Sequence, residues 1–335
     1  MKRKGIKEVA AAAGVSVATA SYVLSGTGRP SAQTRKRVLE VADQLGFIRD
    51  ASAARLRTGK SNLVGVILNN IINPFFSELV ASLEAIVYEA GGLTLLATAQ
   101  NDLVRQEQLL ASMVAQRVGS VILSPVHGST TDDLAPILAH GLPLVVCVRD
   151  VVGSQAAFVG VDDEKSGYLA AECLLAAGHR SIVFIGGYPH TTTWDGRCAG
   201  IRRALADAAL PEAACRMLPG LMHPDFAEEK MLFLASQGML PNAVICFNDD
   251  QASGAYRASR KLGMIVGRDI SIVAFDNIPQ GRILDPELTT VDIQPALIGR
   301  TSAEFALRRI TSKETSAPRR TLEPALIRRA SVIST

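Results

Sequence analysis

Five polar side chains stand shortly after apolar runs, at positions where an α/β sheet usually binds a ligand. Asn73, Asp162, Asn248 and Asp276 each follow such a run, and Arg197 follows a Gly-Gly-Tyr-Pro turn after another. Ligands of open α/β sheets lie at the carboxyl ends of the strands. One forked cationic donor with amide and carboxylate acceptors predicts a site for a hydroxylated or acidic small molecule. The alternative is that these residues cap helices or form loop salt bridges, and for Asp162 both interpretations remain open.

Two aromatic positions could complete this site. Trp194 is the only tryptophan of the chain and lies close to Arg197, so it could stack on a sugar face or plug the core. Phe75, with Phe76 beside it, could form a pocket wall or pack in the core beneath a helix. We include Trp194 and Phe75 among the expected ligand contacts.

The sequence carries no motif of enzyme chemistry. It contains no G-x-S-x-G, H-E-x-x-H or G-x-G-x-x-G pattern, and its five histidines are dispersed. Residues 59–61 resemble the end of a phosphate-binding loop, but Ala54 stands where that motif needs its first glycine. No two cysteines have the spacing of metal ligands. We therefore expect no catalytic residues, no metal site, no cofactor and no enzyme activity.

Charge is divided unevenly along the chain. The first sixty residues hold 12 Lys and Arg against four Asp and Glu, a net charge of +8, whereas the remainder carries −5. A basic head on a mildly acidic body predicts a polyanionic partner for the head only. A solvated basic surface is the alternative.

Cysteine usage and the lack of long apolar segments also predict a cytoplasmic protein. Five scattered cysteines, an odd number, are typical of reduced thiols and not of a secreted disulfide framework. Lys7 and Glu8 interrupt any apolar signal segment near the N-terminus. No run of 18 apolar residues is present, so we expect no membrane span.

The first fifty residues have the pattern of a helix-turn-helix. Apolar residues from Ile6 to Ala13 have helical spacing, and Gly14 can end that helix in a left-handed conformation. Ser16 can cap a second helix over 17–24, and a third is expected over 31–45. A tight turn between two short helices places the second helix in the DNA major groove. Helical hairpins of this size also occur in plain bundles.

Six stretches of the chain form a more specific combination: Gly5–Ala10, Ala13–Thr19, Arg35–Leu39, Leu45–Phe47, Leu56–Ser61 and Asn73–Phe76. Together they resemble the lactose/galactose repressor family of bacterial transcriptional regulators. The resemblance covers nearly the whole chain, and it implies DNA binding by the head and control by a small molecule bound to the body.

The resemblance also implies which residues contact DNA. Val17 and Ala18 would select bases, and phosphate contacts would fix the register. Leu56, in a hinge helix, would wedge into the minor groove and kink the duplex. Tyr22 departs from the pattern, because many family members have Arg or His there. The complete expected set is Ser16, Val17, Ala18, Thr19, Ser21, Tyr22, Arg29, Ala53 and Leu56.

From residue 62 onward, short apolar runs alternate with helical segments. The runs are apolar throughout, which is typical of parallel strands covered on both faces. We expect strands over 63–68, 94–99, 120–124, 142–148, 157–161, 181–185, 243–247 and 270–275. Helices are expected over 75–90, 103–116, 165–177, 197–208, 225–236 and 251–262.

These strands are too many for one sheet, so we predict an all-α helix-turn-helix head and an α/β periplasmic-binding-protein-like body with two doubly wound lobes. The expected boundaries are 1–49 for the head, 50–61 for the hinge helix and linker, 62–161 plus 290–330 for the first lobe, and 162–289 for the second. A cleft between such lobes closes on its ligand. The resemblance assigns effector contacts to Arg197, Asn248 and Asp276.

The expected function is that of a transcriptional repressor. It would bind a pseudo-palindromic operator as a homodimer, under control of a sugar or sugar acid in the cleft, in the cytoplasm and on the nucleoid when bound. No leucine heptads follow Ile310, so no tetramer-forming coil is expected. A transporter-linked solute-binding protein would need export and leaves the basic head unexplained. An architectural DNA protein leaves the large acidic body unexplained.

Overall fold

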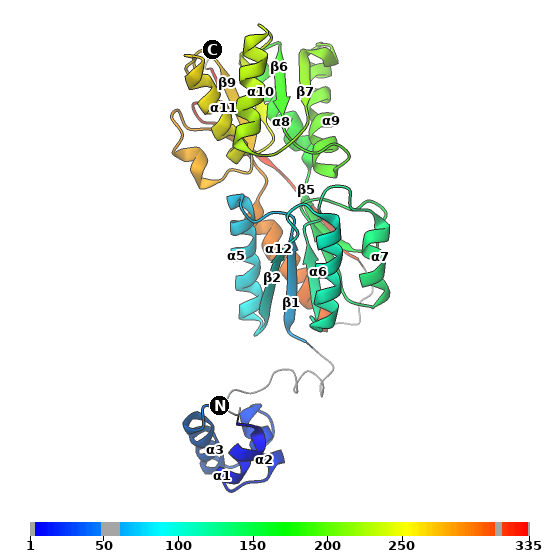
Figure 1. Ribbon diagram of the computed structural model, residues 1–335, viewed down its shortest axis with the longest axis vertical. Helices are drawn as coiled ribbons and strands as arrows, with labels where there is room; N and C mark the ends of the chain where they lie inside the picture. Colours follow the sequence, from blue (N-terminus) through cyan, green and yellow to red (C-terminus); the bar gives the residue numbers. More distant parts are fainter. Residues whose placement is uncertain (1–3, 48–60, 312–316, 334–335) are drawn as a thin grey trace. The chain divides into compact units, whose positions relative to one another are not determined.

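The computed structural model describes residues 4–47, 61–311 and 317–333 (Figure 1). The chain divides into two compact units, which we name the head unit (residues 1–60) and the body unit (residues 61–335). The expected hinge helix, with Ala53 and Leu56, lies outside the described residues. No helix within the described ranges is long and apolar enough to cross a membrane.

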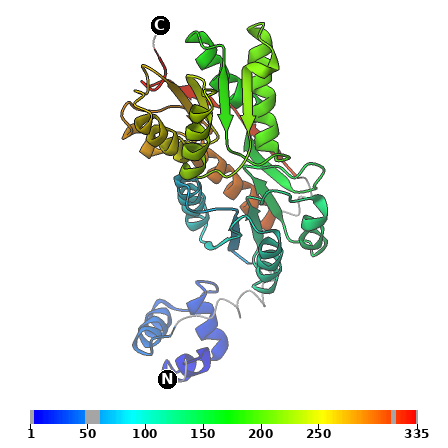
Figure 2. The ribbon, with the colours of Figure 1, turned by 45° about the horizontal axis from the view of Figure 1, so that its top comes forward.

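The head unit is a helix-turn-helix with a third helix packed against it (Figure 2). Gly14 has φ +62°, the left-handed conformation that lets the chain turn sharply after the first helix. The Oγ of Ser16 accepts a hydrogen bond from the amide of Thr19 at 3.1 Å and so caps the second helix. The three helices are α1 (Ile6–Ala12), α2 (Val17–Leu24) and α3 (Ala32–Gln44). Their shared core consists of Val9, Ala10, Ala13, Ala20, Val23, Val38 and Ala42.

The first lobe of the body unit is built on a parallel sheet of order β11-β5-β4-β3-β1-β2. The central strands are buried on both faces, which explains their uninterrupted apolar sequences. The strands are β1 (Leu63–Leu68), β2 (Leu93–Thr98), β3 (Ser120–Leu123), β4 (Leu144–Cys147), β5 (Ala157–Val161) and β11 (Arg319–Leu322). The helices are α5 (Pro74–Glu89), α6 (Leu103–Ala115), α7 (Thr131–Ala139) and α12 (Pro295–Thr311).

The second lobe repeats this plan with the order β12-β10-β9-β8-β6-β7, in which only β12 is antiparallel to its neighbour. Its strands are β6 (Ile182–Ile185), β7 (Cys215–Leu218), β8 (Ala243–Cys246), β9 (Ser271–Phe275), β10 (Thr289–Asp292) and β12 (Ala325–Ile327). Its helices are α8 (Asp163–Ala176), α9 (Thr192–Asp207), α10 (Pro224–Ser236) and α11 (Asp249–Lys261). Two 3₁₀ turns, η1 (Glu212–Ala214) and η2 (Pro279–Arg282), complete it. The architecture confirms the predicted fold class.

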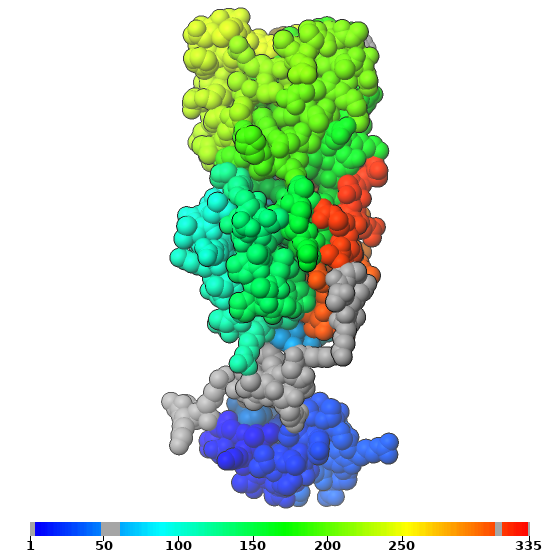
Figure 3. Space-filling view, turned by 90° about the vertical axis from the view of Figure 1, so that its right-hand side faces the viewer, coloured from blue at the N-terminus to red at the C-terminus, as the bar shows by residue number. Residues whose placement is uncertain are grey.

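The C-terminal tail is shared between the lobes, which corrects the expectation that 290–330 belongs to the first lobe alone. Strand β10 continues the second sheet beside β9, and only then does α12 cross to pack on α5. Strand β11 extends the first sheet beside β5, where its red segment is visible in Figure 3, and β12 returns to the second sheet. The chain therefore crosses between the lobes three times, after β5, β10 and β11.

Helices α8 and α9 approach each other closely through glycines. A Cβ added to Gly200 would lie 1.8 Å from the carbonyl oxygen of Glu164, and one added to Gly167 would lie 2.1 Å from that of Arg197. Both distances are shorter than any real carbon–oxygen contact, so only glycine fits at either position. The two glycines therefore set the spacing between the helices that carry Asp163 and Arg197.

We expect Gly200→Ala to destabilise the body unit by about 1–3 kcal/mol or more, because the added methyl forces backbones apart. Urea unfolding of the full chain, followed by the fluorescence of its single tryptophan, Trp194, measures this loss. Gly281→Ala is the matched control, since its added Cβ would lie an ordinary 3.6 Å from Leu288. Equal destabilisation by both substitutions would contradict the helix-spacing role.

Candidate functional site

A cleft between the two lobes collects side chains from the carboxyl ends of several strands. It encloses a cavity of about 60 Å³. The first lobe lines it with Asn69, Asn70, Asn73, Phe75, Phe76, Val148 and Arg149. The second lobe contributes Thr193, Arg197, Met222, Phe247, Asn248 and Asp276, and Ile293 lies where the chain crosses between lobes. This is the edge at which open α/β sheets bind ligands.

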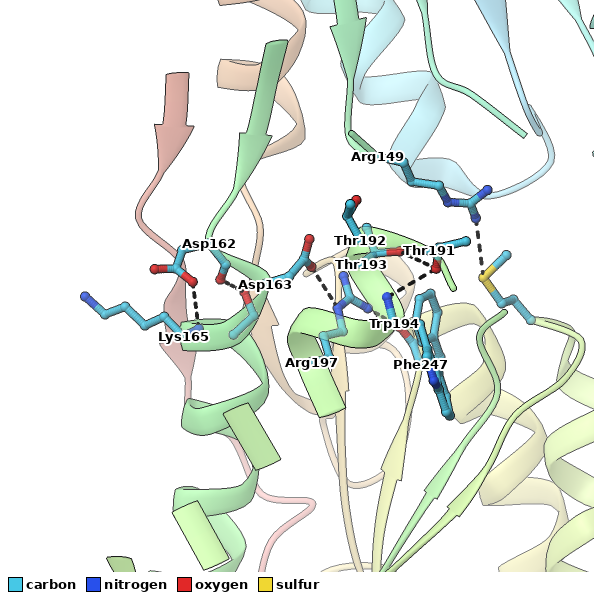
Figure 4. Close-up of polar contacts among 12 residues, drawn as sticks. Arg149, Asp162, Asp163, Lys165, Thr191, Thr192, Thr193, Trp194, Arg197 and Phe247 are labelled. Atoms are coloured by element: carbon cyan, nitrogen blue, oxygen red, sulfur yellow. Dashed lines mark hydrogen bonds and ion pairs between the residues drawn. The ribbon is translucent and has the colours of Figure 1, made fainter. Parts of the chain in front are cut away.

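Arg197 is held rigidly in the wall of this cleft and is only 3% exposed (Figure 4). Its Nε donates to Oδ1 of Asp163 at 3.1 Å, and its Nη1 donates to the carbonyl of Phe247 at 2.7 Å. The guanidinium also lies 4.5 Å from the ring centre of Phe247 and 4.1 Å from that of Phe275. Burial raises the pKa of Asp163 to about 7, although the neighbouring Arg197 lowers it. Arg197 therefore enters the cleft as half of a buried ion pair.

The sequence analysis expected a helix to begin at Arg197, which is wrong, because the helix begins five residues earlier. Helix α9 begins at Thr192, because the Oγ1 of Thr191 accepts from the amide of Trp194 at 3.3 Å and caps it. The earlier start puts Thr193 and Arg197 on the same side of α9, and both line the cleft.

Asp276 is a buried carboxylate that bridges the lobes by a hydrogen bond. It follows β9 with φ +111° and is 5% exposed. Its Oδ2 accepts from the Nδ2 of Asn73 at 2.9 Å, while the Oδ1 of Asn73 caps α5 by accepting from the amide of Phe75. Within the described residues, Asp276 has no cationic nitrogen closer than 4.0 Å. Burial raises its pKa to about 7, with Arg197 acting in the opposite direction.

The other expected ligand residues divide into two groups. Phe75 and Asn248 line the cleft; Asn248 also caps α11 by accepting from the amide of Gln251 at 2.8 Å. Asp162 and Trp194 do not line it. Asp162 caps α8 through the amide of Lys165 at 2.8 Å, so the helix-cap interpretation left open for it fits. The ring of Trp194 is buried, stacked on Phe184 with ring centres 4.9 Å apart, and it plugs the second lobe.

Sequence reasoning missed several lining residues. Arg149 directly follows the strand expected over 142–148, so the rule that found Asp276 also selects it. Asp163, the ion-pair partner of Arg197, was also missed and stands one position after Asp162. Met222 and Ile293 are apolar residues in connecting segments, and no sequence pattern distinguishes them from core positions.

Two further contacts join the lobes beside the cleft. The backbone amide of Asp150 donates to Oγ1 of Thr192 at 2.9 Å, which brings the end of β4 to the N-terminus of α9. On the same side, the rings of His127 and Tyr188 stack with centres 4.4 Å apart. Together with the Asn73–Asp276 hydrogen bond, these contacts connect the two lobes around the cleft.

In the head unit, α2 presents its N-terminal turn to solvent. Ser16, Ala18 and Arg29 are exposed, as are Val17 at 43% and Tyr22 at 51%. Thr19 and Ser21 are half-buried, and the Oγ1 of Thr19 is bonded to the Oγ of Ser16 at 2.9 Å. Small side chains at the start of α2 leave its backbone open to close approach by a partner.

The raised pKa of Asp276 predicts a pH dependence of stability. The folded protein keeps a proton on Asp276 up to about pH 7, whereas the unfolded chain releases it near pH 4. Stability contributed by this proton is therefore lost as pH rises from about 4 to 7 and is constant above that. Asp276→Asn cannot ionise, so its free energy of unfolding should fall less between pH 5 and 8, by about 1.4 kcal/mol for each pH unit up to about pH 7.

Urea unfolding of both proteins across this pH range measures the difference. Asp132→Asn, which removes an exposed carboxylate from α7, is the control and should follow the unsubstituted protein. Parallel pH profiles for the unsubstituted protein and Asp276→Asn would show that Asp276 is ionised in the folded state throughout.

Comparison with known proteins agrees with both units. A model described as "Bacterial regulatory proteins, lacI family" matches residues 5–50, and one described as "Periplasmic binding protein-like domain" matches residues 171–332. The HTH-type transcriptional repressor PurR of Haemophilus influenzae (strain PittEE) is 32% identical over 334 residues, and that of Pasteurella multocida (strain Pm70) is 30% identical over 331 residues. Each alignment covers 98% of both chains.

The fold is shared with a solved repressor. The crystal structure of the Lac repressor dimer bound to operator and the anti-inducer ONPF superposes with a TM-score of 0.89. The match covers 99% of this chain and 100% of that chain, at 24% identity. Because a repressor at 32% identity aligns along almost its whole length and a lacI-type model matches the head, this chain belongs to the lacI family of bacterial regulatory proteins.

Proposed function

We propose that this repressor binds a near-palindromic operator as a homodimer and that a small molecule in the interlobe cleft controls its affinity for DNA. The observation that carries the proposal is the exposed start of α2, with Val17 and Ala18 free of the head's core. Side chains at this end of the second helix of a helix-turn-helix reach base edges in the major groove. Tyr22 and Arg29 would add contacts at its other end.

An exposed apolar edge of the first lobe supports the homodimer. Strand β2 is the last strand of its sheet, and its Leu93 is 70% exposed and Leu96 40%. Tyr88, 71% exposed, precedes it at the end of α5. Apolar edge strands are usually covered, and a second copy related by a two-fold axis covers the same surface on both chains. The solved Lac repressor noted above is a dimer on its operator.

The cleft supports control by a small hydroxylated or acidic ligand, of the sugar or sugar-acid type. Asn73, Asn248 and Asp276 offer amide and carboxylate groups, and Phe75 and Phe247 offer flat apolar walls. A ligand that favours the closed cleft must shift any equilibrium coupled to closure. Residues 50–61 would carry that shift to the head unit, with a coupling of about 1–3 kcal/mol.

Operator selection from a random duplex pool at physiological salt tests DNA reading by the full chain. We expect enrichment of a pseudo-palindrome with two half-sites. Ala18→Asn should change the enriched bases, because Asn can pair with adenine in the major groove. Gln44→Asn, at an exposed position on α3, should select the original sequence. Failure to enrich any sequence, with and without a metabolite pool, would contradict sequence-specific binding.

Effector control is tested with Arg197→Lys on the selected operator. Lysine keeps the charge that balances Asp163 but loses the planar fork, so the concentration of active metabolite needed for half-maximal response should rise about tenfold or more. Operator affinity without metabolite should stay within about twofold, since α2 is untouched. Arg202→Lys, at a half-exposed position of α9, is the control. An unchanged response would make Arg197 a purely structural partner of Asp163.

A further inference from the structure

Arg149 is a buried cation without an acidic partner. It follows β4, lines the cleft and is 7% exposed. Its Nη1 donates to the carbonyl of Pro125 at 3.3 Å, and its Nη2 lies 4.0 Å from the Sδ of Met222. Throughout the described part of the chain, no carboxylate oxygen comes within 4.0 Å of its nitrogens. Most of its five N–H donors are therefore left for a group that enters the cleft.

Arg197, in the same cleft, has the partners that Arg149 lacks. Arg197 is balanced by Asp163, hydrogen-bonded to Phe247 and stacked on two rings. Arg149 has neither an ion pair nor a stacked ring within the described residues, and its one bond to a carbonyl, that of Pro125, is long at 3.3 Å. A charge taken from water without a partner destabilises the folded protein, and burial accordingly lowers the pKa of Arg149 to about 10. Such a group is retained at a cost in stability, which calls for a functional reason.

The surroundings of Arg149 favour an anion. Arg149 lines the same cavity as Thr193, which lies in the first turn of α9, and Figure 4 shows the guanidinium in contact with a sulfur atom, that of Met222. The hydrogen bond from the amide of Asp150 to Thr192 holds the backbone next to Arg149 at the start of α9. The N-terminus of this 16-residue helix carries partial positive charge and N–H groups without intrahelical partners. Arg149 and Thr193 therefore border the same cavity from opposite lobes.

We propose that Arg149 binds the anionic group of the effector in the cleft, so that the effector is an acidic hydroxylated metabolite and not a neutral one. The assignment rests on the proposed control of the repressor by a ligand in the cleft. Arg149 donates to a carboxylate or phosphate, for both of which its fork is suited. Asp276 and Asn248 accept from and donate to hydroxyl groups of the same molecule.

Isothermal titration of the full chain with paired probes tests the assignment. The pairs are galacturonate with galactose, gluconate with glucose, and ribose 5-phosphate with ribose, which separate carboxylate from phosphate. We expect an acidic member to bind and its neutral partner to bind far more weakly. Arg149→Gln should weaken the acidic probe about 30-fold or more, because the anion would then be buried unpaired. Arg202→Gln, which removes the same charge outside the cleft, should change nothing.

A second measurement needs no ligand. If Arg149 serves an incoming anion, Arg149→Gln relieves an uncompensated buried charge, and the thermal unfolding midpoint of the ligand-free protein should stay the same or rise. A clear fall in that midpoint would assign Arg149 a structural role and overturn the proposal. Operator binding by this variant without ligand should be unchanged.

The outcomes separate this proposal from the broader function. Binding of a neutral probe with equal affinity to the unsubstituted protein and Arg149→Gln overturns the anion assignment, even if that probe releases the operator. Binding of no acidic probe overturns it as well. An acidic probe that requires Arg149 but leaves operator affinity unaltered upholds the assignment and contradicts effector control of the repressor.

Discussion

The buried ion pair between Arg197 and Asp163 is the interaction on which the cleft depends. Through it, and through the Phe247 carbonyl and two aromatic rings, one guanidinium connects α8, α9 and the ends of β8 and β9. Burying the Arg197 charge alone would strongly destabilise the fold, so Asp163 must be buried together with it. Gly167 and Gly200 make this possible, because larger residues would hold the two helices too far apart.

Around this ion pair, the cleft keeps two ionisable groups that have no partner of opposite charge within the described residues. Asp276 comes from the second lobe and has only the amide of Asn73, and Arg149 comes from the first lobe and has only weak neutral contacts. The paired Arg197 and Asp163 thus form part of the rigid wall, whereas Asp276 and Arg149 are free to bind a ligand. A molecule that satisfies both would also tie the lobes together, which is the physical link between recognition and closure.

The sequence predicted the fold class well because its signals are local. Strands such as β1 and β5 are buried on both faces, and their apolar runs define both ends correctly. Strand β7 escaped notice because the exposed Arg216 interrupts a short edge strand. Within the site, strand-end polarity found Asn73, Asn248 and Asp276. It failed for Asp162, which caps α8, while its neighbour Asp163 pairs with Arg197. Tertiary packing alone reveals that Trp194 belongs to the core.

The triple crossing between the lobes has a consequence for how the protein is made. The first sheet is complete only when β11, at Arg319–Leu322, pairs with β5, and the second only when β12 arrives. Neither lobe is a continuous stretch of chain, so during synthesis the first lobe cannot finish folding until β11 has been translated, nor the second until β12 has. The head unit, with its own core within residues 1–60, is translated before either lobe. Domains generally fold as units during synthesis. The DNA-reading part can therefore be complete while the part that regulates it is still unfinished.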